Sequence, residues 1–155
     1  MLDIDLREII TVSMVLFAVI DIVGSIPIII GLRVKHGHIE SEKASIVAMV
    51  LMIVFLFAGK TLLAVIGVDV ASFAIAGSFV IFAIAMEMVL GLTIFKDDAN
   101  DSATTSIVPL AFPLIAGAGT MTTLLSLRSQ FHTINIIIAI ILNIILVYIV
   151  LKSSK

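Results

Sequence analysis

A single carboxylate stands in the middle of an otherwise apolar stretch, followed at once by residues that disrupt helices. The stretch 9–32 has one charged residue, Asp21, and reads DIVGSIP from there to Pro27. An acid at mid-bilayer costs about 3 kcal/mol on insertion scales, and such acids mark ion or substrate pathways. Pro27 removes a helical hydrogen-bond donor, and Gly24 loosens the backbone. The pattern predicts a helix that is interrupted within the apolar stretch.

Two interpretations of this interruption stay open. In the first, a second half-helix begins inside the membrane, with Gly24 or Ser25 as its cap, and its free N–H groups attract an anion such as a carboxylate. Asp21, Gly24, Ser25 and Pro27 would then form part of a substrate site. In the second, the helix is only kinked, and Asp21 bonds the backbone groups that the kink releases.

A second interrupted stretch lies at 107–127, which contains no charged residue. Proline at 109 and 113 is followed by AGAGT at 116–120, where a short helix could open with its backbone exposed. The glycines alone are explained by close helix packing. Together with the first interruption, however, the pattern predicts an inverted-repeat transporter. Gly117, Gly119 and Thr120 are the candidate substrate-binding residues of this second stretch.

A second buried acid, Glu87, lies within a third apolar stretch. Burial raises the pKa of a carboxyl group, so Glu87 and Asp21 are the two candidates for carrying a coupling proton. Glu87 could equally be an acid that bonds a neighbouring helix. Asn135 and Asn143 share one helical face, and we expect them to hydrogen-bond across helices.

The elements that must position these residues are long and apolar. Hydrophobic residues make up 61% of the 155-residue chain and charged residues 13%, where soluble domains carry about 25%. Runs of about 20 residues without polar alternation indicate membrane-spanning helices and exclude a β-barrel. We therefore expect an all-α polytopic transmembrane bundle in one domain, residues 1–155, with a broken first and a broken fourth helix. The five expected segments are 9–32, 44–68, 70–95, 107–127 and 133–151.

Charge and composition limit the function and set the orientation. Arg33, Lys35, Lys43, Lys96, Lys152 and Lys155 all fall on one side of a five-span topology, which predicts an inner-membrane protein with its N-terminus outside. There is no basic stripe for nucleic acid, no cysteine and no catalytic motif, so we expect a non-enzyme without cofactor or metal. The loop sequence His36-x-His38-x-Glu40 is interpreted as solvated rather than metal-binding. The expected partners are the lipid bilayer and a small polar solute.

Two motifs resemble those of a known family. DIVGSIP at 21–27 is similar to the Asn/Asp-Pro-x-Gly-x-x-Pro motif of the MarC family of integral membrane proteins. VPLAFPLIAGAGT at 108–120 is similar to that family's Pro-Leu-Ala-x-Pro-Leu-x-Ala-Gly-Pro-Gly motif. The likeness covers nearly the whole chain. It implies a six-span fold, and some members act as small neutral amino acid transporters.

Three departures from the family pattern affect this expectation. Ile22 and Ala118 stand where the family commonly has proline, and the chain reaches Lys155 where members continue into a sixth helix. The 3+3 inverted repeat is therefore expected to be incomplete, and the exposed apolar faces to favour self-association. The leading hypothesis is a secondary transporter of small neutral amino acids or similar small polar solutes. The alternative is a non-transporting structural or regulatory membrane component, or an inactive shortened member.

Overall fold

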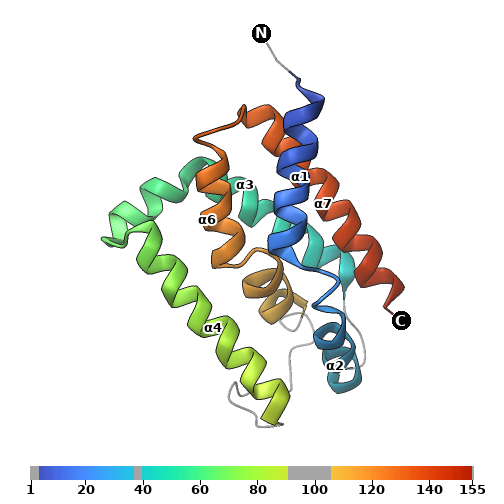
Figure 1. The fold of residues 1–155 in the computed structure, drawn as a ribbon. Coiled ribbons are helices and arrows are strands. Elements are labelled where there is room, and N and C mark those ends of the chain that lie inside the picture. The colour runs from blue at the N-terminus through green and yellow to red at the C-terminus, as the bar shows by residue number, and fades with distance from the viewer. Residues whose placement is uncertain (1–3, 37–39, 91–105, 155) are drawn as a thin grey trace.

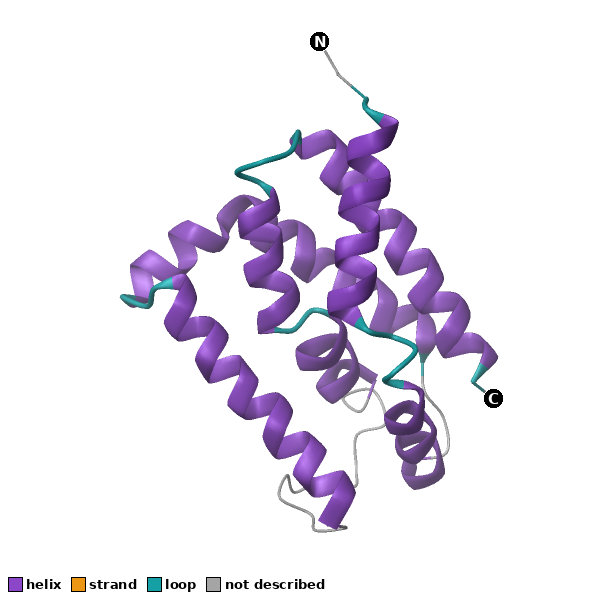
Figure 2. Cartoon of the chain, in the orientation of Figure 1, coloured by secondary structure: helices purple, strands orange, loops and turns teal. Residues whose placement is uncertain are grey.

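The computed structural model describes residues 4–36, 40–90 and 106–154, and all regular structure in these ranges is helical (Figures 1 and 2). This confirms the all-α prediction. The first and fourth expected segments are each divided in two, as predicted. The elements are α1 (Leu6–Ile20), α2 (Ile26–His36), α3 (Ser41–Ile66), α4 (Val70–Leu90), η1 (Ser106–Ile115), α6 (Ala118–Leu127) and α7 (Thr133–Ser153).

Two helices, α3 and α7, are long and apolar enough to cross a membrane, judged by length and composition. α3 has 26 residues and α7 has 21, so at 1.5 Å per residue they extend for about 39 and 32 Å. The hydrocarbon core of a bilayer is about 30 Å thick. Both helices are therefore long enough to cross the hydrocarbon core, as the length of their apolar sequences predicts.

The helix ends follow from local residues. Asp5 caps α1 by accepting the backbone N–H of Arg7 at 2.8 Å. α3 ends at Gly67, whose φ of +75° is the left-handed conformation that glycine adopts without strain. Asp69 then opens α4, because its Oδ1 accepts the N–H of Ser72 at 2.9 Å and its Oδ2 accepts the Ser72 hydroxyl at 2.7 Å. These caps turn the chain sharply between α3 and α4.

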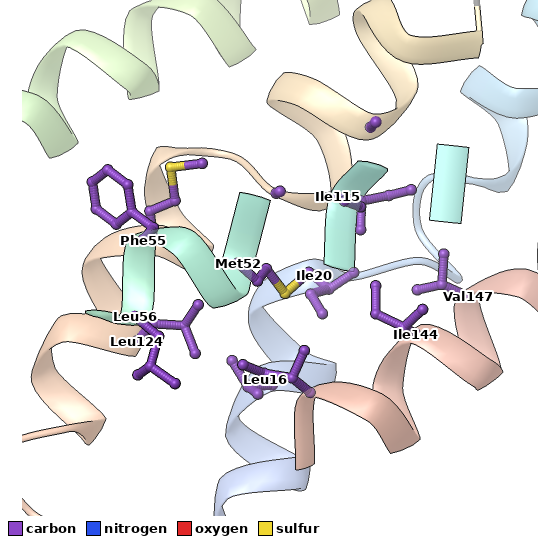
Figure 3. Packing of buried hydrophobic residues seen from close by; sticks show 14 of the residues in the cluster. Leu16, Ile20, Met52, Phe55, Leu56, Ile115, Leu124, Ile144 and Val147 are labelled. Atoms are coloured by element: carbon purple, nitrogen blue, oxygen red, sulfur yellow. The ribbon is translucent and has the colours of Figure 1, made fainter. Parts of the chain in front are cut away.

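The core lies where α1, α3 and α7 meet, with η1 and α6 covering α3. α1 buries Ile9, Val12, Leu16 and Ile20, which recur every three or four residues and so form one helical face. Figure 3 shows the side chains that close this core. The labelled side chains come from α1, α3, η1, α6 and α7: Leu16, Ile20, Met52, Phe55, Leu56, Ile115, Leu124, Ile144 and Val147.

The two broken segments occupy equivalent places in the bundle. α1 packs on α7, η1 packs on α3, and α3 packs on α7. In Figure 1, α1 descends from the N-terminus toward its break, whereas η1 and α6 ascend. This exchange of partners and reversal of direction is the arrangement that the predicted inverted repeat requires.

The outside of the bundle is apolar. α4 packs mainly on α6 and leaves Ile75, Phe79 and Phe82 about 60–68% exposed. α7 likewise exposes Ile145 and Ile149 by 50% or more. Soluble proteins rarely expose such continuous apolar helix faces to water, whereas lipid tails are as apolar as these side chains. The exposed surface agrees with a membrane-embedded bundle.

Candidate functional site

The first break follows from the backbone of Asp21. α1 ends at Ile20, and Asp21 adopts φ 44° and ψ 49°, the left-handed region, while its N–H donates to the Phe17 carbonyl at 3.1 Å. Aspartate is among the few non-glycine residues that visit this conformation, which costs about 1–2 kcal/mol. α2 starts only at Ile26. Backbone strain of this kind concentrates at functional sites.

The polar atoms of residues 21–25 bond one another. The Gly24 N–H donates to Asp21 Oδ1 at 3.2 Å, and the Ser25 N–H and hydroxyl donate to the Asp21 carbonyl at 3.0 and 2.9 Å. Ser25 directly precedes α2, and its carbonyl accepts the Ile29 N–H at 3.0 Å, as expected of the residue that begins the helix. Its hydroxyl, however, is directed back to the Asp21 carbonyl. The helix is discontinuous, as the first interpretation predicts, and Asp21 bonds a released amide, as the second predicts. The anion site of the first interpretation stays a prediction.

The second break begins with a widened helix. η1 is π-helical, and its pattern of i to i+5 bonds continues to Ala116, whose N–H donates to the Ala111 carbonyl at 2.9 Å. Both prolines of the segment, at 109 and 113, fall within η1 and cannot donate to any helical ladder. Gly117 then precedes α6 in extended backbone, with φ −83° and ψ 178°. π-Helical turns of this kind occur frequently at functional sites.

α6 begins without a side-chain cap. Gly117 has no side chain to accept the first N–H groups of the helix, which have no intrahelical partners. Thr120 does not fill that role, because its hydroxyl donates to the Ile115 carbonyl at 2.9 Å and the residue is only 2% exposed. Its predicted contact with a substrate stays a prediction. Within the described residues, therefore, no side-chain hydrogen bond caps the positive end of the α6 dipole.

The two breaks lie close together. A Cβ atom at Gly119 would be 3.7 Å from Cγ1 of Val19, so the first turn of α6 lies against the last turn of α1. Figure 1 shows α1 descending to the level at which α6 starts to rise. The negative end of one helix dipole thus lies beside the positive end of another. The structure brings together Gly119 and the residue two positions before Asp21.

The remaining predicted residues divide into three groups. Asp21, Gly24 and Gly119 are exposed, whereas Ser25 and Gly117 are buried. Pro27 is exposed and forms the second residue of α2. Glu87 belongs to α4, but its side chain lies outside what the structure describes, as do residues 37–39 of the histidine-containing loop.

Sequence reasoning missed two residues next to the site, Val19 and Gly77. Val19 is one apolar residue among many, and nothing in the sequence distinguishes it. Gly77 lies in a run of small residues, Ala76-Gly77-Ser78, which is a signal of close helix packing. The partner of that packing could not be read from the sequence.

Both ends of the bundle are closed by polar contacts between helices. At the N-terminal end of α1, Glu8 Oε2 accepts the Asn135 amide at 2.7 Å and the backbone N–H of His132 at 3.2 Å. Asn143, two turns further along α7, donates to the Ser13 carbonyl at 3.2 Å. The prediction that both asparagines bond across helices is confirmed.

At the opposite end, Arg33 of α2 donates to the Leu151 carbonyl near the end of α7. Arg128 lies in the α6–α7 turn, at the same end as Glu8 and His132. It donates to the Phe57 carbonyl of α3 at 3.0 Å and lies 5.6 Å from the Phe57 ring centroid. These contacts hold the two short half-helices, α2 and α6, to the long helices. They thereby help to fix the positions of α2 and α6 relative to the rest of the bundle.

Comparison with known proteins agrees with this architecture. The profile of the MarC family, described as MarC family integral membrane protein, matches residues 6–155. A UPF0056 membrane protein of Pyrococcus abyssi is 36% identical over 148 residues, which cover 90% of this chain and 73% of that protein. The UPF0056 inner membrane protein YhgN of Escherichia coli is 32% identical over 136 residues, covering 81% of this chain and 66% of YhgN.

The matched relatives are longer than the region they share with this chain. A Buchnera aphidicola UPF0056 membrane protein, 28% identical over 97% of this chain, is matched over 80% of its own length. No solved structure matches the chain. The match along nearly all of the sequence is nevertheless decisive: the chain belongs to the MarC family of integral membrane proteins.

Proposed function

We propose that this chain is a secondary transporter of small zwitterionic solutes, with neutral amino acids as the substrate class. The observation that carries the proposal is the contact of the last turn of α1 with the first turn of α6, where a Cβ at Gly119 would lie 3.7 Å from Val19. Two half-helix ends that meet inside a membrane bundle are the usual place for a transported solute.

The polarity of these ends fits a zwitterion. The start of α6 at Gly117, Ala118 and Gly119 offers backbone N–H groups and a positive dipole end, which suit a carboxylate. The end of α1 offers backbone carbonyls, a negative dipole end and the Asp21 carboxylate, which suit an ammonium group. A free α-amino acid carries both charges within a few ångströms. An uncharged solute would gain little from this arrangement.

Asp21 has a second possible use as the carrier of a coupling proton. Its carboxylate is exposed and accepts the N–H of Gly24 at 3.2 Å, at the break itself. Glu87 is the other candidate, because it is the one carboxylic acid in the largely apolar sequence of α4. Coupling to a pH gradient is therefore part of the proposal.

The setting proposed is the inner membrane, with the N-terminus outside. The E. coli relative is named an inner membrane protein. Arg33 and Lys152 lie at the end of the bundle where α2 contacts α7, and positively charged residues favour the inner side. The exposed apolar face of α4 also favours self-association, which cross-linking in membranes would detect.

A non-transporting structural or regulatory role is the alternative, and one observation favours it. The matched relatives extend beyond the shared region, which covers 66% of YhgN. A chain that acts only as a component of an assembly would copurify with a stoichiometric partner and move no solute.

Uptake of labelled alanine and glycine into proteoliposomes, with and without a pH gradient, tests the proposal. We expect uptake by the wild-type chain and a loss of at least about tenfold in Asp21→Asn, since a hydrogen bond to a charged group contributes about 1.5–3 kcal/mol. Asp69→Asn is the matched control, because Asp69 caps α4 in the α3–α4 turn and asparagine caps equally well. No uptake by the wild type, or equal uptake by Asp21→Asn, would contradict the proposal.

A further inference from the structure

The contact between α4 and α6 leaves no room for a side chain on α4. A Cβ atom at Gly77 would lie 2.0 Å from the Cβ of Ala118 and 3.4 Å from its Cα. Non-bonded carbon atoms pack at about 3.5–4.0 Å. A methyl group at position 77 therefore requires that α6 move away from α4 by about 1.5 Å, or that α4 itself move.

Ala118 is the first residue of α6, so this contact acts on the proposed site. Gly117 precedes it as the uncapped start of the helix, and Gly119 follows it against Val19 of α1. α6 packs on α4 and on α1, and Figure 1 shows α6 between these two helices. A displacement of α6 away from α4 thus moves its first turn toward α1.

We infer that Gly77 is a positioning residue whose contact with Ala118 sets the separation between the end of α1 and the start of α6, and so limits the size of the solute that binds there. This inference rests on the proposed function for its substrate, but the positioning itself does not. Gly77 lies on a different helix from both breaks and offers the solute no charge or hydrogen-bonding side chain. Its contribution is the absence of a side chain at one point of α4.

Two further variants serve as a matched control and as a compensating exchange for Gly77→Ala. Gly31 lies in the middle of α2 and is exposed, and a Cβ added there has nothing within 4 Å. Gly31→Ala therefore makes the same chemical change without a new contact. The exchange Gly77→Ala/Ala118→Gly removes the clashing Cβ. The methyl at position 77 then faces only backbone atoms of residue 118, at 3.4 Å for Cα and 3.8 Å for N, which are ordinary contacts.

The first experiment measures position without transport. The chain has no cysteine, so Gly119→Cys is a single reporter at the start of α6. We expect a small cationic methanethiosulfonate reagent to modify this cysteine several-fold more slowly in Gly77→Ala. The rate should return to the parent value in the exchange variant and stay unchanged in Gly31→Ala. Equal rates in all variants would overturn the inference, as would an exchange variant that does not recover.

The second experiment measures substrate size in the chain without a cysteine. In Gly77→Ala we expect the KM for alanine to rise more than that for glycine. The preference for glycine should increase by about tenfold or more, since one methylene is worth about 1–3 kcal/mol in a tight site. A merely unstable protein would lower uptake of both solutes equally and leave their ratio unchanged. An unchanged ratio would overturn the size restriction.

The two experiments separate the two hypotheses. If no variant takes up either solute but the reporter at position 119 responds as expected, the proposed function fails while the positioning by Gly77 stands. If Gly77→Ala does not reach the membrane, the exchange variant should do so. If neither variant reaches the membrane, the contact with Ala118 is not the reason that position 77 must be glycine, and the inference is overturned.

Discussion

The Asp21 carboxylate covers Gly24. Its Oδ1 accepts the Gly24 N–H at 3.2 Å, and a Cβ at position 24 would lie 2.3 Å from Oδ2. A side chain at position 24 would therefore have to displace the Asp21 carboxylate. The absence of a side chain allows the carboxylate to fold back over the break, where it meets an amide that α2 does not use.

The first prediction is that Gly24→Ala displaces this carboxylate. The hydrogen bond is lost, and we expect the free energy of unfolding to fall by about 1 kcal/mol. Uptake should fall much further, because Asp21 no longer occupies its place at the break. Thermal unfolding in detergent measures the first effect and proteoliposome uptake the second.

A double-mutant cycle identifies the cause. In an Asp21→Ala background there is no carboxylate to displace, so Gly24→Ala should change stability little further. Gly31→Ala, in open space on α2, should be neutral or raise stability by up to about 1 kcal/mol. An equal loss from Gly24→Ala with and without Asp21 would show that the carboxylate is not responsible.

Local sequence was enough to predict both breaks. Pro27 and Gly24 interrupt the first segment by backbone chemistry alone, and the structure starts α2 at Ile26. The glycines after residue 116 likewise mark the point at which α6 begins. Such signals act within a few residues of the chain, so they can be read without knowing the fold.

The partners of the breaks could not be predicted in the same way. The approach of Val19 to Gly119 joins residues 100 positions apart, and that of Gly77 to Ala118 joins different helices. In a membrane, most faces of a helix are apolar whether they meet lipid or protein, so hydropathy does not identify the packed side. Ser25 shows a further limit. A serine that precedes a helix can cap the first N–H groups of that helix or bond a preceding carbonyl. Here the left-handed turn at Asp21 places the Asp21 carbonyl 2.9 Å from the Ser25 hydroxyl.

A second prediction concerns the link between α1 and α7. Asn143 is 5% exposed and donates to the Ser13 carbonyl at 3.2 Å and to the Ala139 carbonyl at 2.9 Å. Interhelical hydrogen bonds in membranes contribute about 0.6–1.7 kcal/mol, so Asn143→Ala should lower the free energy of unfolding by about 1 kcal/mol. Titration with SDS in mixed micelles measures the free energy of unfolding of the variant and of the wild type.

The neighbouring Ile145 provides the comparison for this variant. Its side chain is 50% exposed on the outer face of α7, so Ile145→Ala removes the same number of non-hydrogen atoms without removing a hydrogen bond. We expect a smaller loss than for Asn143→Ala. If the two losses are equal, the hydrogen bond to Ser13 contributes nothing measurable.

A third prediction is an acid-dependent loss of stability at the α3–α4 turn. The N–H of Ser72, followed by its hydroxyl and the N–H of Ala71, holds the pKa of Asp69 below its ordinary value of 3.8. A carboxylate with a lowered pKa stabilises the fold at pH values above its ordinary pKa. That contribution is lost as the pH falls below 3.8 through the value in the folded protein.

Asp69→Asn keeps the cap but cannot titrate, so its unfolding temperature should fall less than that of the wild type between pH 5 and about pH 3. Glu42→Gln on α3 removes an exposed carboxylate whose Oε1 accepts the Tyr148 hydroxyl at 3.5 Å. It serves as the charge-matched control and should follow the wild type. Parallel curves for Asp69→Asn and the wild type would contradict the assignment.

The fourth prediction is the orientation in the membrane. The contact of Glu8 with His132 places the start of α1 and the α6–α7 turn at the same end of the bundle. The contact of Arg33 with Leu151 places the end of α2 with the end of α7 at the other. Because Arg33 and Lys152 belong to this second end, the positive-inside rule places it in the cytoplasm.

Single cysteines in the cysteine-free chain test this orientation. Ser129 in the α6–α7 turn and Ser153 at the end of α7 are both exposed. An impermeant maleimide should label Ser129→Cys in intact cells, but Ser153→Cys only after permeabilisation. The reverse pattern would place the N-terminus inside. Labelling of both from outside would mean that α7 does not cross the bilayer, because α7 is the segment that connects these two positions.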